Sequence, residues 1–189
     1  VPAASAANAS CRVITDGPND EVDQLEFVLH AALSAARDEI LIMTPYFLPS
    51  AALVAALQGA ALRGVHTAVL LPLHNNLKYV DWATRHQLPG LLERGIRVRY
   101  QAGPFCHSKL LVVDGRYTQF GSANWDPRSL LLNFELNVEC FDHDFAARMS
   151  AHFKARWEAA AELTHAAAQR RSLPVRLRDA LCALFSPYL

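Results

Sequence analysis

The sequence HSKLLVVD occupies residues 107–114 and places polar side chains directly before a short apolar run. The apolar run predicts a buried strand over residues 110–113, which ends in a turn at Asp114. Residues two apart in a strand share a face, so we expect His107 and Lys109 to point in the same direction. An imidazole beside a fixed ammonium suits phosphoryl chemistry, because the ammonium holds phosphate oxygens while the imidazole attacks phosphorus or protonates the leaving oxygen.

The neighbours of this pair are expected to have structural roles. Asp114 lies seven positions after His107, and this odd spacing puts it on the opposite face of an unbroken strand. We therefore interpret Asp114 as a residue of the turn that also forms an ion pair. Cys106 falls on the face opposite His107 as well and is expected in the core.

A second group of candidate side chains follows the return strand expected at residues 117–120. Gly121 lets the backbone approach a ligand closely, and the polar groups of Ser122 and Asn124 can then donate hydrogen bonds to phosphate oxygens. Further along, Glu135 can accept a hydrogen bond from one imidazole nitrogen. That bond would fix the tautomer of the histidine and leave its other nitrogen for the reaction.

Strand and helix patterns alternate along the rest of the chain. Strands are expected at residues 11–14, 40–43, 65–71, 96–100 and 134–141, and helices at about 20–33, 50–64, 78–94 and 144–160. Asn19 or Asp20 is expected to cap the first helix, and Ser50 the second. Pro89 and Gly90 are expected to break the third. This alternation predicts the α/β class, with a mixed β-sheet sandwiched between helices.

The composition fits one globular domain, because 52% of the 189 residues are hydrophobic and 18 basic side chains balance 18 acidic ones. The lack of a basic excess argues against nucleic acid as a partner. No apolar run reaches the length of a membrane span. We expect an Ala/Ser-rich linker at residues 1–10, one α/β lobe at 11–160 and a basic amphipathic C-terminal tail at 161–189.

The tail has the pattern of a basic amphipathic helix. Four leucines and a tyrosine recur every three or four residues among four arginines, at positions Leu173, Leu177, Leu181, Leu184 and Tyr188. Ser172 is expected to cap this helix, with Pro174 tolerated in its first turn. Such a helix either lies in the interface of a membrane that contains anionic lipid or packs its apolar stripe on the lobe, and both interpretations stay open.

Several of these motifs together resemble the phospholipase D superfamily. HSKLLVVD fits its HxKxxxxD signature, and GSANWDPRSLLLNFELN at residues 121–137 resembles the bacterial cardiolipin synthases within it. TPYFLP at 44–49 and the Pro-Phe pair at 104–105 resemble the same group. The resemblance implies one phospholipase D-like lobe, with active-site residues at His107, Lys109, Ser122, Asn124 and Glu135.

The resemblance also implies a mechanism. Two HxKxxxxD motifs face each other across one site, and neither a metal nor another cofactor takes part. One histidine attacks phosphorus to form a phosphohistidine, while the other protonates the departing alcohol and activates the incoming one. The order of motifs makes His107 the general acid/base of a phosphatidyl transfer between phosphatidylglycerol molecules. The implied location is peripheral, at the cytoplasmic face of a bacterial inner membrane.

Three side chains near these motifs allow two interpretations each. Tyr46 and Trp125 either line an entrance for a lipid or glycerol group or pack inside the fold. Arg128 either contacts phosphate or braces its own loop.

The sequence contains a single HxKxxxxD motif: His152 is also followed by a lysine two positions later, Lys154, but residue 159 is alanine where the motif has aspartate. One imidazole cannot stand on both sides of phosphorus in an in-line displacement, so we expect a partner motif from outside the sequence. The missing initial Met and the resemblance to the second half of the cardiolipin synthases favour a partner lobe within a longer parent chain over a homodimer mate. This first HKD lobe would carry its own HxKxxxxD (HKD) motif. The isolated chain is then expected to be inactive. A homodimeric phospholipase D or nuclease-type phosphodiesterase, and a non-catalytic lobe that binds phosphate or lipid headgroups, remain alternatives.

Overall fold

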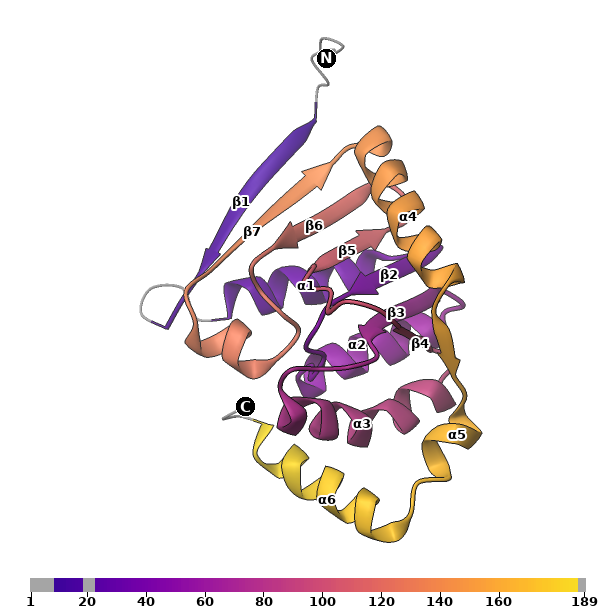
Figure 1. Cartoon of the computed structure of the whole chain (residues 1–189). Coiled ribbons are helices and arrows are strands. Elements are labelled where there is room, and N and C mark those ends of the chain that lie inside the picture. Colours follow the sequence, from indigo (N-terminus) through magenta and orange to yellow (C-terminus); the bar gives the residue numbers. More distant parts are fainter. Residues whose placement is uncertain (1–8, 19–22, 187–189) are drawn as a thin grey trace.

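The computed structural model describes residues 9–18 and 23–186 (Figure 1). The described residues form an eight-stranded mixed sheet with the strand order β1-β7-β6-β5-β2-β3-β4-β8. The strands are β1 (Ser10–Asp16), β2 (Glu39–Met43), β3 (His66–Pro72), β4 (Arg97–Gln101), β5 (Leu110–Val113), β6 (Tyr117–Gly121), β7 (Glu135–Phe141) and β8 (Ala161–Leu163). Strands β2, β3 and β4 run parallel, and every other pair of neighbours is antiparallel.

Helices cover both faces of this sheet (Figure 1). One face packs against α1 (Gln24–Ala35), α2 (Ala51–Leu62) and α3 (Lys78–Glu93). The other face packs against α4 (His143–Glu158) through Leu41, Leu70 and Val112. The central strands are apolar on both faces for this reason. The predicted α/β sandwich with a mixed sheet is confirmed.

A local capping signal explains where α2 begins. The Ser50 hydroxyl accepts a hydrogen bond from the Leu53 amide at 3.3 Å, which makes Ser50 the N-cap of α2 as expected. Helix α1 begins after Asp23, which has a φ of 72°. The caps expected at Asn19 or Asp20 lie outside the described residues.

The break expected at Pro89 and Gly90 is wrong, because α3 continues through both residues. Proline lacks the N–H that would bond to the carbonyl four residues earlier, which belongs to Arg85. Arg171 replaces that donor: its Nη2 donates to the Arg85 carbonyl at 2.8 Å. A side chain from the far end of the sequence therefore completes the helix.

The C-terminal segment differs from the expected tail. Strand β8 pairs with β4, so the sheet extends beyond the expected boundary at residue 160. Helix α5 (His165–Gln169) and helix α6 (Leu173–Leu184) follow, and both pack against α3 (Figure 1). The α6 leucines are exposed, so packing of the leucine stripe on the lobe is wrong, and Tyr188 lies outside the described residues. None of the helices within 9–18 and 23–186 is long and apolar enough to cross a bilayer.

Candidate active site

Four chain segments meet at one end of the sheet, because the antiparallel order brings the end of β2, the start of β5, the end of β6 and the start of β7 together. Backbone hydrogen bonds join the loop after β2 to the loop after β6. The Leu48 amide donates to the Trp125 carbonyl at 2.6 Å, and the Trp125 amide donates to the Tyr46 carbonyl at 3.2 Å. The motifs at residues 44–49 and 121–137 therefore form one wall around the start of β5.

His107 and Lys109 lie together at the start of β5. The Lys109 Nζ is 3.0 Å from Nδ1 and 3.3 Å from Nε2 of His107, and it donates to the His107 carbonyl at 2.9 Å. His107 is exposed, whereas Lys109 is half-buried. The two side chains come together, but both precede β5, so the strand alternation from which their common direction was predicted does not apply to them.

Burial and charge shift the pKa values of both groups. Burial and the charge of Lys109 lower the pKa of His107. Burial also lowers the pKa of Lys109, although the carboxylates of Glu135 and Asp126 oppose that change. At neutral pH the imidazole is therefore mostly neutral and can accept a hydrogen bond from the ammonium.

We expect the substitution Lys109→Met to raise the pKa of His107, because it removes the positive charge that disfavours the imidazolium. Burial persists in the variant, so the increase is only part of the total shift. An NMR titration of the His107 ring protons would measure it, with Lys154→Met as a control because Lys154 pairs with Glu39 instead. An unchanged His107 pKa in Lys109→Met would contradict this electrostatic coupling.

Glu135 and Ser122 have partners other than those expected. The Glu135 carboxylate accepts hydrogen bonds from the Ser122 hydroxyl and from Asn133 Nδ2. No hydrogen bond joins Glu135 to His107 among the described residues. The reason is strand register: the Ser122 amide donates to the Leu136 carbonyl at 3.0 Å, which extends the β6–β7 ladder and brings Ser122 beside Glu135. In this geometry the hydroxyl proton of Ser122 is directed to Glu135 rather than into open space.

Asn124 is buried at the base of the site. Its Nδ2 donates to the Ser129 hydroxyl at 3.1 Å. Its Oδ1 has no hydrogen-bond partner within the part of the chain that the structure describes. One amide hydrogen of Asn124 is left over, because the NH₂ group has two donors and only one is used here.

Asp126 is a site residue that the sequence patterns did not single out. It is buried, and its Oδ1 accepts from the Ser129 amide at 2.8 Å, at the start of the short π-helix η1 (Arg128–Leu132). Burial, followed by the charge of Glu135, raises the pKa of Asp126 despite its hydrogen bonds to the backbone. Aspartate is a favoured residue at the start of a helix because its side chain accepts from a backbone amide of the first turn, so Asp126 directly before Pro127 is the local signal for this position.

Two residues near the motifs are needed by the fold rather than by a ligand. A methyl group at Gly121 would overlap the Asn137 side chain and the Leu136 carbonyl on β7, so this glycine allows two strands to approach. Asp114 lies at the opposite end of β5, where it accepts hydrogen bonds from the amides of residues 37, 38 and 39 at 2.8–3.0 Å. Its partners are backbone amides, so the expected ion pair of Asp114 is wrong.

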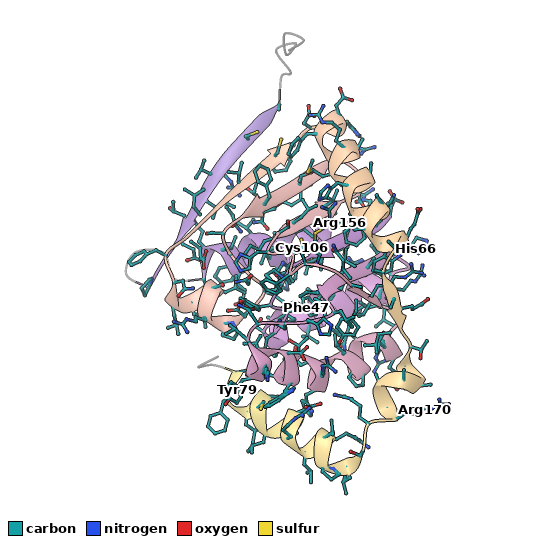
Figure 2. All side chains as sticks on the ribbon, viewed as in Figure 1. Phe47, His66, Tyr79, Cys106, Arg156 and Arg170 are labelled. Atoms are coloured by element: carbon teal, nitrogen blue, oxygen red, sulfur yellow. The ribbon has the colours of Figure 1, made fainter. Side chains whose placement is uncertain are left out.

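Aromatic side chains frame His107. The Tyr46 ring lies edge-on to the imidazole with centroids 5.9 Å apart, and the Phe105 ring lies 5.7 Å away. Trp125 is instead buried and packs against Phe47, which Figure 2 labels inside the fold. Tyr46 therefore belongs to the site, and Trp125 packs.

Cys106 is only half-buried, although it packs partly against the core on the α4 side. Burial raises its pKa, but hydrogen bonds with Ser108 and the charge of Arg156 outweigh burial, so the pKa of the thiol is lowered. Figure 2 shows Cys106 and Arg156 close together.

Comparisons with known proteins agree on one family. The model of the cardiolipin synthase phospholipase D-like domain matches residues 29–157. A cardiolipin synthase from Oceanobacillus iheyensis is 34% identical over 185 residues, which cover 98% of this chain and 39% of that protein. One from Staphylococcus aureus is 32% identical, over 98% of this chain and 37% of that protein. The chain thus spans about two fifths of the length of these relatives.

Solved structures share the fold at lower identity. Phosphatidylserine synthase from Haemophilus influenzae superposes with a TM-score of 0.77 at 16% identity, covering 96% of this chain and 48% of that one. The phospholipase D family member Nuc from Salmonella typhimurium superposes with a TM-score of 0.71 at 21% identity, covering 82% of this chain and 99% of that one.

Proposed function

This chain belongs to the family of cardiolipin synthase phospholipase D-like domains, and from that membership we propose that it is one of two catalytic lobes of a phosphatidyltransferase. The observation that carries the proposal is the His107–Lys109 pair, which stands at the open end of the sheet with Glu135 and Asp126 close to the ammonium. We assign the lobe to residues 10–163 and treat the helices that follow as an appended tail.

In the proposed reaction, the histidine of the other lobe attacks the phosphorus of one phosphatidylglycerol, and the bond from phosphorus to the glycerol oxygen breaks. His107 gives its proton to that oxygen, so that glycerol leaves as a neutral alcohol. The imidazole then takes the proton from an alcohol of a second phosphatidylglycerol, whose oxygen displaces the phosphohistidine nitrogen. Lys109 binds a non-bridging oxygen throughout and stabilises the charge that develops there.

The free site suits the second of these proton transfers. With its pKa lowered by burial and by Lys109, His107 is a base at neutral pH. A phosphate group beside the ring favours the imidazolium, because an opposite charge raises the pKa of a histidine. Binding of the substrate phosphate therefore favours the protonated His107 that is needed to protonate the leaving glycerol oxygen.

The partner is proposed to be a first HKD lobe in a longer chain. The share of the relatives that this chain covers, 39% and 37%, leaves room for such a lobe in them. A homodimer is the second candidate, favoured by one observation: the superposition takes up 99% of the Nuc chain, which is thus about one lobe in size. Sedimentation velocity would separate the two, since only the second predicts a dimer of this chain.

A phospholipid substrate requires access to a bilayer. We propose that the lobe works peripherally, at the cytoplasmic face of a bacterial inner membrane, and that nucleic acid is not its substrate. The balance of 18 basic and 18 acidic side chains supports the exclusion of nucleic acid.

Titration with inorganic phosphate tests this half of the site. We expect phosphate to shift the His107 ring signals in NMR spectra, and Lys109→Met to weaken binding at least about tenfold because it removes a charge-assisted hydrogen bond. Lys154→Met, at the other end of the sheet, should bind as the unmodified chain does. Equal binding by the Lys109→Met variant would overturn the assignment of the phosphate site.

A further inference from the structure

Helix α6 packs against the lobe with the side that carries Asp179 rather than with its row of leucines. Asp179 is 0% exposed and forms ion pairs with Arg171 and Arg178. The Arg178 guanidinium also lies 4.1 Å from the centroid of the Trp82 ring on α3. The side of α6 that faces the protein therefore combines this buried charged group with Val175, Cys182 and Ala183, which are half-buried.

The opposite side of α6 is a stripe of exposed leucines. Their exposed fractions are 67% for Leu173, 62% for Leu177, 58% for Leu181 and 76% for Leu184. Residues three and four apart lie on one face of a helix, so these side chains form a continuous row, which Phe185 extends at 55%. Single exposed leucines are common, but a continuous apolar row on a helix indicates a surface that binds something apolar.

The polar contacts fix this orientation. Arg171 donates to Asp179 and also to the carbonyls of Arg85 and Ala168. Rotation of α6 to bury its leucines would move Asp179 away from Arg171 and Arg178 away from the Trp82 ring. The leucines therefore stay outward in the folded chain.

We propose that this leucine face docks onto an anionic lipid bilayer, an inference that rests on the proposed action on phospholipids and names the surface that meets them. The charges on α6 and on the segment directly before it favour an anionic bilayer as the partner. Asp179 is the only acidic side chain between residues 165 and 186, and it is buried. Arg170 and Arg176 are exposed, so the outward surface offers leucines and arginines without a carboxylate. Apolar side chains enter the boundary of the acyl chains while arginines attract anionic headgroups.

The position of α6 connects this surface to the site. Arg171 contacts Arg85 and Arg178 contacts Trp82, so α6 runs antiparallel to α3 and its last turn lies beside the start of α3 (Figure 1). Helix α3 begins at Lys78, after the end of β3, at the same end of the sheet as the site. Tyr79 is exposed there and points away from the fold (Figure 2). Docking would hold the site near the headgroups.

Vesicle sedimentation of the 189-residue chain tests the proposal. We expect sedimentation with vesicles of phosphatidylcholine and phosphatidylglycerol, and weaker binding to phosphatidylcholine alone. The double substitution Leu177→Ser/Leu181→Ser should reduce binding at least about tenfold, since it removes two apolar anchors. Arg170→Gln/Arg176→Gln should remove most of the preference for phosphatidylglycerol.

A matched control replaces exposed apolar side chains elsewhere. Phe27→Ser/Leu62→Ser changes two residues that are each 71% exposed on α1 and α2, and it should bind vesicles normally. Three results would each overturn the proposal. Vesicle binding could fall equally in this control, or stay unchanged in the Leu177/Leu181 variant. The chain could also dimerise through these leucines without binding vesicles. The phosphate titration distinguishes failure of the membrane proposal from failure of the proposed active site, because Lys109→Met should weaken phosphate binding and leave vesicle binding unchanged.

Discussion

Replacing His107 with alanine is expected to lower phosphatidyl transfer at least about a thousandfold wherever this lobe is paired with a second HxKxxxxD lobe. The substitution removes the only group that we assign to protonate the leaving glycerol and to deprotonate the incoming alcohol. His107 is exposed and its ring bonds only with Lys109 among the described residues, so its loss should leave the fold intact.

A chimera would measure this effect. In it, the matching 39% of the Oceanobacillus iheyensis cardiolipin synthase is replaced by this chain, and conversion of labelled phosphatidylglycerol to cardiolipin is followed with release of glycerol. His66→Ala is the matched control, because His66 is an exposed histidine that begins β3 at the opposite end of the sheet (Figure 2). Transfer by the His107→Ala chimera at the unmodified rate would remove His107 from the mechanism.

The isolated chain provides the complementary measurement. A monomer with one imidazole should not hydrolyse a soluble phosphodiester, because an in-line displacement needs groups on both sides of phosphorus. Robust turnover by the monomer that His107→Ala abolishes would refute the requirement for a second lobe. Turnover that grows with the square of concentration would instead identify the homodimer.

Seven of the eight strands in the described residues were predictable because their signals are local, whereas β8 lies in the segment expected to be a tail. An apolar run followed by a turn residue defines β5, although His107 and Lys109 lie just before the strand rather than in it. The Ser50 cap is equally local, since the side chain bonds within its own helix. Such features can be predicted from the sequence because they do not depend on a partner from a distant residue.

The predictions that failed depend on distant partners. Pro89 stays within α3 because Arg171 supplies a donor to the Arg85 carbonyl, and the sequence around Pro89 contains no sign of that contact. Glu135 bonds to Ser122 rather than His107 because of the β6–β7 register. A carboxylate beside several possible donors does not reveal its partner until that register is known.

The tail shows a further limit of pattern analysis. Its leucine spacing predicts a helix with one apolar side, but the pattern does not indicate which side the lobe binds. In the structure, the side of α6 that faces α3 is the one that carries Asp179, which forms ion pairs with Arg171 and Arg178. The inward side of α6 thus carries a buried carboxylate while its leucines point outward, and substitution of Arg171 tests how strongly that carboxylate holds the helix.

Replacing Arg171 with methionine is expected to loosen α6 by about 3 kcal/mol, which corresponds to roughly a hundredfold faster amide exchange in that helix. Methionine keeps much of the apolar stem but removes the guanidinium. The variant therefore loses the ion pair with Asp179 and the donors to the carbonyls of Arg85 and Ala168. Asp179 is then left buried with Arg178 alone, and loss of one partner from a buried pair is strongly destabilising.

Hydrogen exchange followed by mass spectrometry would localise the effect. Peptides from α6 should exchange faster in Arg171→Met, and so should the turn of α3 around Arg85, whereas peptides from β3 in the centre of the sheet should not change. Arg170→Met is the matched control, since Arg170 is an exposed arginine one residue away. The double variant Arg171→Met/Asp179→Leu should recover part of the loss, because a buried pair replaced by apolar side chains no longer leaves a charge without its partner. Unchanged exchange of α6 in Arg171→Met would mean that other contacts hold this helix, and its outward leucines would then need a different explanation.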